Sequence, residues 1–352
     1  MGERSVGETR RVTQQSASLT GNVAEIAAEE AVVAATFLSS IPFFALAHGV
    51  TLRMKGDGAF EAEARITAHS DGAALCAASD GRRLVSGGDD GRLLEITAES
   101  EPRLVAEEAG RWIDAVALRS DGALAWTVSR SVRALLAGGE IKTFDLPSTS
   151  RGVVFMPKGL RLAIAHYNGA TLWYPSASAK PETLEWKGAH LDVTVSPDGR
   201  FLVTSMQENA LHGWRLSDKK NMRMSGYPAK TRSFSWSPDG KWLATSGADA
   251  CILWPFEGKD GPMGASPREC GVRAGVGVTR VAFHPQALVV AVGYEDGMIL
   301  LSRIADGSEI LVRRPVAEEH AKITALAWDA QGKRLAFGAG NGAAGLLRLP
   351  QA

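Results

Sequence analysis

The chain has 352 residues, and its 39 Lys and Arg are balanced by 39 Asp and Glu, so its formal net charge is zero. A hydrophobic content of 45% can fill a large core, which excludes a disordered or fibrous chain, and the charge balance argues against an electrostatically driven nucleic-acid binder. Three cysteines (Cys76, Cys251, Cys270) without a CxxC pair are typical of a reducing compartment, so we expect a cytoplasmic protein.

The N-terminal part of the chain contains one long apolar run. The residues before it are polar and lack the apolar core of a secretory signal. Residues 31–50 carry no formal charge and are long enough to span a membrane. Ser39, Ser40 and Pro42 interrupt this run, and β-branched and aromatic residues dominate both halves. We therefore favour two buried strands around a turn, and a membrane anchor is a weaker alternative.

A unit of about 40 residues repeats along the chain. The segment 233–254 (SFSWSPDGKWLATSGADACILW) has relatives on both sides, and the turn residues that mark their register are spaced 41, 37, 40, 41, 47 and 45 residues apart. One further step of about 40 residues towards the N-terminus reaches Ser40, so the apolar run becomes the first of eight units. The other markers are Asp80, Asp121, Lys158, Asp198, Asp239, Gln286 and Gln331.

Each unit predicts short strands separated by tight turns. The first strand alternates large and small residues, as in Phe234, Ser235 and Trp236, which indicates a strand buried on both faces where sheets converge on an axis. Asp-Gly or Asn-Gly turns then lead to a second and a third strand, and a variable fourth strand follows. This pattern predicts an all-β chain folded as a β-propeller of four-stranded antiparallel blades, with eight blades favoured and seven as the alternative.

At these residues the sequence resembles the WD-repeat β-propeller family, with divergent repeats. The resemblance extends from about residue 30 to the end and is closest at 237–254, although no third strand ends in the Trp-Asp dipeptide that names the family. It implies a hydrogen-bonded network of a His before the first strand, a Ser or Thr in the second, an Asp in the following turn and a Trp in the third. The residues that fit this network are His69, Ser86 and Asp90; His190, Thr204 and Trp214; and Thr245, Asp249 and Trp254.

The resemblance also implies how the ring closes. The last unit stops after its third strand, near residues 346–349, so its fourth strand must come from elsewhere. We expect the leader, residues 1–30, to supply this outer strand, with residues 11–19 as the candidate, and residues 31–352 to form a single propeller domain. Pairing the first and last segments removes exposed sheet edges.

The sequence contains no nucleophile elbow, P-loop, HExxH motif or dinucleotide fingerprint. In the family's geometry, the loops before the first strand and between the second and third strands share one face, here called the top face. Five of the seven histidines map to it, so a metal-handling protein or an enzyme with a His/carboxylate site at the top of the central channel is the alternative function. They are spread over at least five blades, and we expect no catalytic residue, metal or cofactor. These histidines are His48, His69, His166, His190 and His320.

Arginines and aromatic residues gather near the predicted mouth of the channel on the top face. Such side chains are over-represented at binding hot spots because they combine a large contact area with directed hydrogen bonds. We therefore predict a non-catalytic scaffold or adaptor that binds another protein or peptide on this face, and neither nucleic acid nor a membrane. The candidate contact residues are Arg111, Trp112, Arg151, Tyr167, Arg232, Arg280 and Tyr294.

Overall fold

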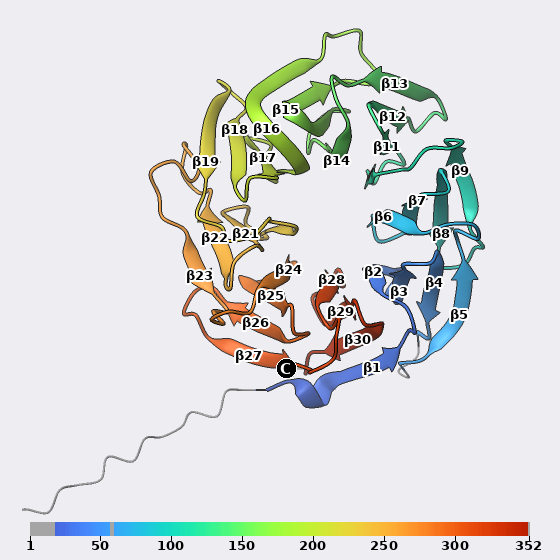
Figure 1. The fold of residues 1–352 in the computed structure, drawn as a ribbon, viewed down its shortest axis with the longest axis vertical. Helices are drawn as coiled ribbons and strands as arrows, with labels where there is room; N and C mark the ends of the chain where they lie inside the picture. The colour runs from blue at the N-terminus through green and yellow to red at the C-terminus, as the bar shows by residue number, and fades with distance from the viewer. Residues whose placement is uncertain (1–17, 57–59, 351–352) are drawn as a thin grey trace, which may run out of the picture.

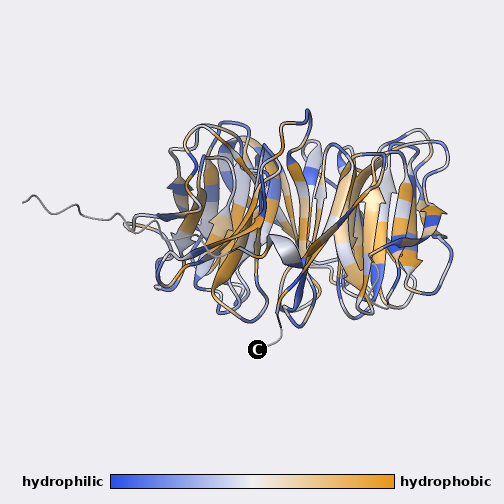
Figure 2. Cartoon of the chain, turned by 90° about the horizontal axis from the view of Figure 1, so that it is seen from below, coloured by the Kyte–Doolittle hydropathy of each residue, from blue (hydrophilic) through white to orange (hydrophobic). Residues whose placement is uncertain are grey.

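The strands form a ring of antiparallel sheets around a central axis (Figure 1). The computed structural model describes residues 18–56 and 60–350. Apolar residues concentrate in the strands, and polar residues are frequent in the loops at the two faces of the disc (Figure 2). The all-β propeller predicted from the repeats is confirmed.

Six sheets have four strands and one has six. The first three four-stranded sheets are β2 (Val32–Leu38), β3 (Ile41–Leu46), β4 (Val50–Met54) and β5 (Ala62–Thr67); β6 (Ala74–Ser79), β7 (Arg83–Gly88), β8 (Arg92–Thr97) and β9 (Arg103–Glu107); and β10 (Ala115–Leu118), β11 (Leu124–Val128), β12 (Ser131–Leu135) and β13 (Ile141–Asp145). The six-stranded sheet is β14 (Ser150–Phe155), β15 (Leu162–Trp173), β16 (Glu182–Val195), β17 (Phe201–Met206), β18 (Leu211–Arg215) and β19 (Lys220–Met224). The remaining sheets are β20 (Phe234–Trp236), β21 (Trp242–Thr245), β22 (Cys251–Pro255) and β23 (Arg268–Cys270); β24 (Val278–Phe283), β25 (Val289–Tyr294), β26 (Ile299–Arg303) and β27 (Glu309–Arg313); and β28 (Ile323–Trp328), β29 (Arg334–Ala339), β30 (Ala343–Arg348) and β1 (Val23–Ala27), which a short 3-10 helix, η1 (Thr20–Asn22), precedes.

The structure has seven separate sheets, so the favoured count of eight separate blades is not supported and the alternative count of seven is. The difference arises in the six-stranded sheet, where β15 and β16 are 12 and 14 residues long. Residues 162–166 of β15 pair with β14, and its later residues pair with β16, which continues onto β17 through residues 190–195. The continuous strand β16 joins the fourth and fifth sequence repeats into one sheet, because it pairs with β15 through residues 182–189 and with β17 through residues 190–195.

The turn predicted inside the fourth repeat is nevertheless present within β15. Asn168 (φ 67°) and Gly169 (φ 144°) have positive φ angles, and His166 on one side is hydrogen-bonded to Thr171 on the other at 2.8 Å. β15 therefore contains two successive strands of the repeat, and the eight sequence repeats are distributed over seven sheets.

The ring closes between the two ends of the chain. β1 is the outermost strand of the sheet that contains β28, β29 and β30, and it pairs antiparallel with β30 from Val23↔Leu347 to Ala27↔Ala343. Arg313, at the end of the preceding sheet, donates to the Glu25 carboxylate of β1 at 3.0 Å and strengthens this seam. The prediction that residues 11–19 close the ring is wrong, because the closing strand is β1. Residues 11–17 of that segment lie outside the described residues.

The apolar run at 31–50 forms β2 and β3, as the two-strand interpretation predicted. Ser39 and Ser40 make the turn between them with φ angles of 46° and 73°. Phe43, Phe44 and Leu46 are fully buried in the core. Among the described residues, no helix is long and apolar enough to cross a membrane.

The repeated Ser-Pro-Asp-Gly turns are stabilised by their own side chains. Asp239 accepts hydrogen bonds from the Ser237 hydroxyl at 2.5 Å and from the Lys241 amide at 3.1 Å. Ser237 in turn accepts from the Trp242 amide at 3.0 Å, and Gly240 supplies the required positive φ of 69°. These local bonds fix where the second strand begins. They also order the turns between first and second strands, which lie on the face opposite the top face.

Candidate functional site

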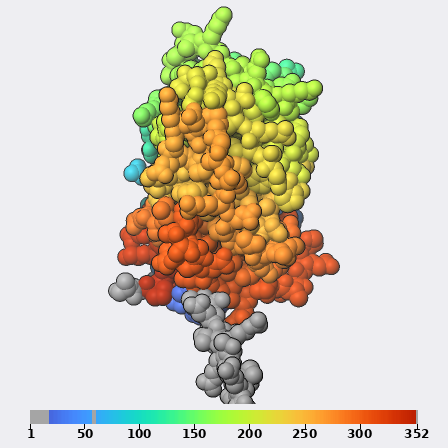
Figure 3. Space-filling model, turned by 90° about the vertical axis from the view of Figure 1, so that its left-hand side faces the viewer, coloured from blue at the N-terminus to red at the C-terminus, as the bar shows by residue number. Residues whose placement is uncertain are grey.

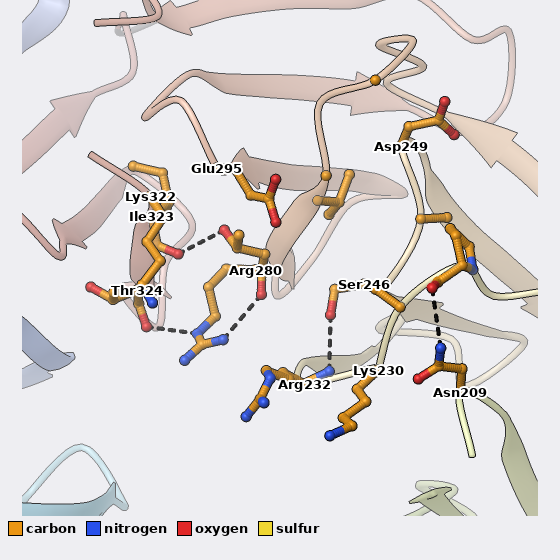
Figure 4. Close-up of a pocket in the computed structure, with 18 residues that line it drawn as sticks. Asn209, Lys230, Arg232, Ser246, Asp249, Arg280, Glu295, Lys322, Ile323 and Thr324 are labelled. Atoms are coloured by element: carbon orange, nitrogen blue, oxygen red, sulfur yellow. Dashed lines mark hydrogen bonds between the residues drawn. The ribbon is translucent and has the colours of Figure 1, made fainter. Parts of the chain in front are cut away.

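A pocket of about 990 Å³ opens on the top face, between the sheets that contain β17, β21, β25 and β28 (Figure 4). Its walls are the loops that precede β20, β24 and β28 and the turns that follow β17, β21 and β25. These are the two classes of loop that the sequence assigned to the top face. The charged side chains that line the pocket, drawn in Figure 4, are Lys230, Arg232, Asp249, Arg280, Glu295 and Lys322.

The pocket has an excess of positive charge. Four cationic side chains and two carboxylates line it. Within residues 18–56 and 60–350, no carboxylate forms an ion pair with Lys230, Arg232 or Lys322. In Figure 4, Lys230 and Arg232 extend into the open space that Arg280 also faces. A cluster of this kind attracts an anion, because several positive charges in one hollow create a local positive potential.

Arg280 is held firmly at the inner wall of the pocket. Its Nε donates to the Thr324 carbonyl oxygen at 2.6 Å, and its Nη1 donates to the Thr279 carbonyl oxygen at 3.0 Å. Burial lowers the pKa of Arg280, and the positive charge of Arg232 lowers it further. The two guanidinium groups therefore repel each other, and neutral carbonyl groups orient Arg280 without cancelling its charge.

Asp192 supplies a charge that opposes that of Arg280, at the start of the innermost part of β16. Burial raises the pKa of its carboxyl group, and the charge of Arg280 acts in the opposite direction. Although protein surrounds this carboxyl group, the residue remains exposed to solvent, as expected for a side chain on the wall of a central channel. No direct ion pair joins Asp192 to Arg280 among the described contacts, so Arg280 retains its capacity for a ligand.

The other candidate contact residues lie away from this pocket. Trp112, with Arg111 beside it in the loop between β9 and β10, is 58% exposed. Arg151, on β14, is exposed and lies 3.7 Å from the Asp114 carboxylate. Tyr167 is 54% exposed and lines a separate hollow of about 690 Å³ with Trp186 and Lys187. The structure thus brings Arg232 and Arg280 together and leaves these four residues dispersed.

Tyr294 is wrong as a contact residue, because its side chain is fully buried. Its hydroxyl donates to the Gly271 carbonyl oxygen, and burial raises the pKa of the phenol. The residue ends β25 next to the top-face turn, but its side chain packs against the neighbouring sheet, where Gly271 directly follows β23. Sequence reasoning also missed Lys230 and Glu295, whose neighbouring residues carry no motif; only their places in top-face loops could have indicated them.

The family network is present as hydrogen bonds in two sheets. His69 is buried, with Nδ1 3.0 Å from an Asp90 carboxylate oxygen and Nε2 2.9 Å from the Ser86 hydroxyl. His190 Nδ1 lies 2.7 Å from the Thr204 hydroxyl, and its ring lies 5.5 Å from that of Trp214. These bonds tie the loop before a sheet to its second strand, so both histidines have structural partners.

The third network uses a tyrosine in place of the missing histidine. The Tyr227 hydroxyl lies 2.7 Å from the Thr245 hydroxyl and accepts a hydrogen bond from the Trp254 indole at 2.6 Å. Burial raises the pKa of Tyr227 to about 12. Asp249, assigned to this network from its position, instead lines the basic pocket.

The histidines do not assemble a metal site in the part of the chain that the structure describes. No group of three or more His, Cys, Asp or Glu side chains there has an arrangement that could hold a metal ion. His48 lies on the surface, 3.2 Å from Glu30, and His166 is bonded to Thr171 and to a backbone carbonyl.

Comparison with known proteins agrees with this geometry. The family model described as WD domain, G-beta repeat matches residues 61–94 and 219–254, and that of the anaphase-promoting complex subunit 4 WD40 domain matches residues 281–351. WD repeat-containing proteins 1-B and 1-A of Xenopus laevis are 34% and 33% identical to this chain over 82 residues. Each of these matches covers 22% of this chain and only 14% of the relative.

A solved structure gives the fold independently of sequence. The crystal structure of the computationally designed Ika8 protein has a TM-score of 0.74 with this chain at 14% identity, covering 92% of this chain and 98% of that one. At this identity the likeness concerns the fold alone. The family matches, the repeated turns and the His69 and His190 networks together support the assignment of the chain to the WD-repeat β-propeller family.

Proposed function

We propose that this protein is a non-catalytic, cytoplasmic scaffold or adaptor whose top face binds an acidic peptide segment of a partner protein. Propellers of the WD-repeat family generally serve protein interaction, which supports the general class. The acidic character of the partner follows from the pocket, where opposite charge would steer encounter and fix register.

One observation carries the proposal: among the described residues, none of the four cationic side chains of the pocket forms an ion pair with a carboxylate. Arg232 and Arg280 are near enough to repel each other, and Lys230 extends into the same space. Holding like charges together costs free energy in the unbound protein. A carboxylate-bearing segment that enters the pocket would relieve this repulsion, and Arg can bind carboxylates through two parallel hydrogen bonds.

The direct test is fluorescence anisotropy with a labelled peptide of alternating Glu and Gly, compared with the matching Lys–Gly peptide. We expect the wild-type protein to bind the acidic peptide alone, with an affinity that falls as salt concentration rises. The double variant Lys230→Glu/Arg232→Glu reverses the charge of the pocket and should abolish binding.

A matched control places the same charge change on the opposite face. Arg82 and Lys158 are exposed residues of turns between first and second strands, and Arg82→Glu/Lys158→Glu should bind the acidic peptide like wild type. Equal loss of binding in both double variants would mean that net charge, and not the pocket, governs association. Absence of binding to wild type would overturn the proposed partner chemistry.

A further inference from the structure

Two of the three cysteines face each other across neighbouring strands. Cys251 is the first residue of β22, Cys270 is the last residue of β23, and the two are directly paired in the antiparallel register. Both are free thiols. Residues opposite each other in such a pair have Cα atoms about 4.5–5.5 Å apart, which falls within the range of about 4.4–6.8 Å that a disulfide requires.

The environment makes the two thiols chemically unequal. The neighbouring Cys251 thiol lowers the pKa of the Cys270 thiol. The neighbouring Cys270 sulfur and complete burial raise the pKa of Cys251. Cys270 is therefore the sulfur that ionises first, and the thiolate is the nucleophile in thiol oxidation.

Access to the pair is also asymmetric. β23 is only three residues long and is the outermost strand of its sheet, on the outer rim of the ring (Figure 1; Figure 3 faces this side). Cys270 retains 6% exposure, whereas Cys251 has none. A short edge strand opens more readily than the strands inside a sheet, so a small oxidant reaches Cys270 before Cys251.

We propose that Cys251 and Cys270 form a reversible oxidation site, which hydrogen peroxide converts to an intramolecular disulfide. The Cys270 thiolate attacks one peroxide oxygen and breaks the O–O bond, giving Cys270 sulfenic acid and hydroxide, which takes up a proton to form water. The Cys251 sulfur then attacks the sulfenic sulfur, releases its proton and displaces a second water. Two thiols lose two electrons, and one peroxide is reduced to two waters; a dithiol reverses the bond.

The bond would fix the strands beneath one wall of the basic pocket. Ala248 and Asp249, just before Cys251, and Gly275 and Gly277, just after Cys270, all line that pocket. The Arg273 amide already donates to the Asp249 carbonyl oxygen at 2.8 Å across the same gap. The inference itself depends on the thiol pair and not on the proposed partner.

Cys76 provides an internal control. It lies on β6, and burial raises the pKa of its thiol to about 12. Its sulfur donates to the Ile113 carbonyl oxygen at 3.3 Å. No other cysteine is paired with it, so it should remain a free thiol under conditions that oxidise the pair.

The test treats the folded full chain with hydrogen peroxide, then denatures it, alkylates free thiols and identifies linked peptides by mass spectrometry. We expect a Cys251–Cys270 link with loss of two hydrogens, an alkylated Cys76, and full reversal by dithiothreitol. Oxidation of Cys76 at an equal rate, a link that involves Cys76, or three alkylated thiols at a peroxide excess would overturn the proposal.

Serine variants test the order of the two steps. In Cys251→Ser, the sulfenic acid at Cys270 has no resolving thiol and should be trapped by dimedone. In Cys270→Ser, dimedone should label Cys251 far less. Equal labelling of the two variants would refute the assignment of Cys270 as the attacking sulfur, and the wild-type measurement does not depend on how either variant folds.

Discussion

His212 should make the stability of the ring depend on pH. Its side chain is fully buried, and neither ring nitrogen has a hydrogen-bond partner among the described residues. The ring stacks on Trp186, with centroids 4.0 Å apart, and lies edge-on to Trp214 at 4.7 Å. Burial lowers the pKa of His212 to about 3, and the nearby His190 acts in the same direction.

The sign of the effect follows from proton binding. In the unfolded chain the pKa is 6.5, so between pH 6.5 and about 3 the unfolded state binds a proton that the folded state does not. The contribution of His212 is therefore fully present above pH 6.5 and is lost as the pH falls, at about 1.4 kcal/mol per pH unit. At pH 5.0 this residue alone should reduce the free energy of unfolding by about 2 kcal/mol. Burial also lowers the pKa values of His166 and His190, which adds to the loss.

Urea unfolding at pH 7.5 and pH 5.0 measures this loss. The variant His212→Leu removes the titrating ring at similar volume, so it should lose about 2 kcal/mol less than wild type between the two pH values. His48→Gln changes a surface histidine, leaves the aromatic stack intact and should behave like wild type. If His212→Leu lost as much stability on acidification as wild type, the buried ring could not be the source of the pH dependence.

Three further changes test the hydrogen-bond network of Tyr227, the pairing of β1 with β30 and the basic pocket. Tyr227→Phe leaves two buried hydrogen-bonding side chains without their shared partner and should cost about 1–3 kcal/mol in urea unfolding; an unchanged free energy would show that the hydroxyl is dispensable. Deletion of residues 1–27 removes β1 and exposes the edge of β30, so it should lower the Tm and promote association on size-exclusion chromatography, whereas deletion of residues 1–17 keeps every described strand and should not. Arg232→Gln relieves the repulsion on Arg280, so it should weaken acidic-peptide binding without loss of stability at low salt; a drop in Tm would contradict the assigned repulsion.

The sequence predicted the features that depend on neighbouring residues. The Ser-Pro-Asp-Gly turn is one example, because Ser237 and Asp239 bond to amides only a few residues away. The merging of two repeats was not predictable in this way, since it rests on β16 running without a break from its pairing with β15 to its pairing with β17. Tyr227 escaped notice for a similar reason: the motif expects a histidine, and only the folded sheet shows which side chain reaches Thr245.

The sequence predicted a residue of the candidate site correctly only where the position of the residue in its repeat also decides which way its side chain points. Arg232 precedes the innermost strand β20 and Arg280 lies near the start of the innermost strand β24, and the convergence of these strands brings the two residues to one pocket. Tyr294 also has a suitable position in the chain, but its side chain packs against the neighbouring sheet and reaches Gly271. Position along a repeat therefore locates a residue near a face, whereas packing decides whether its side chain is available there.

Because the ring holds Arg280 in a fixed position, the repulsion between Arg280 and Arg232 is evidence for an anionic ligand. On a flexible loop, Arg280 could turn away from Arg232, and the repulsion between them would carry no information about a ligand. Here two backbone carbonyls hold the Arg280 guanidinium in place, and Thr279 beside it donates to the Ile323 carbonyl oxygen at 2.7 Å. Arg280 therefore cannot turn away from Arg232, and an anion bound beside both arginines would reduce their repulsion. The hollow at Tyr167 lacks such a pair of arginines, which is why the acidic segment is assigned to the pocket between β20 and β28.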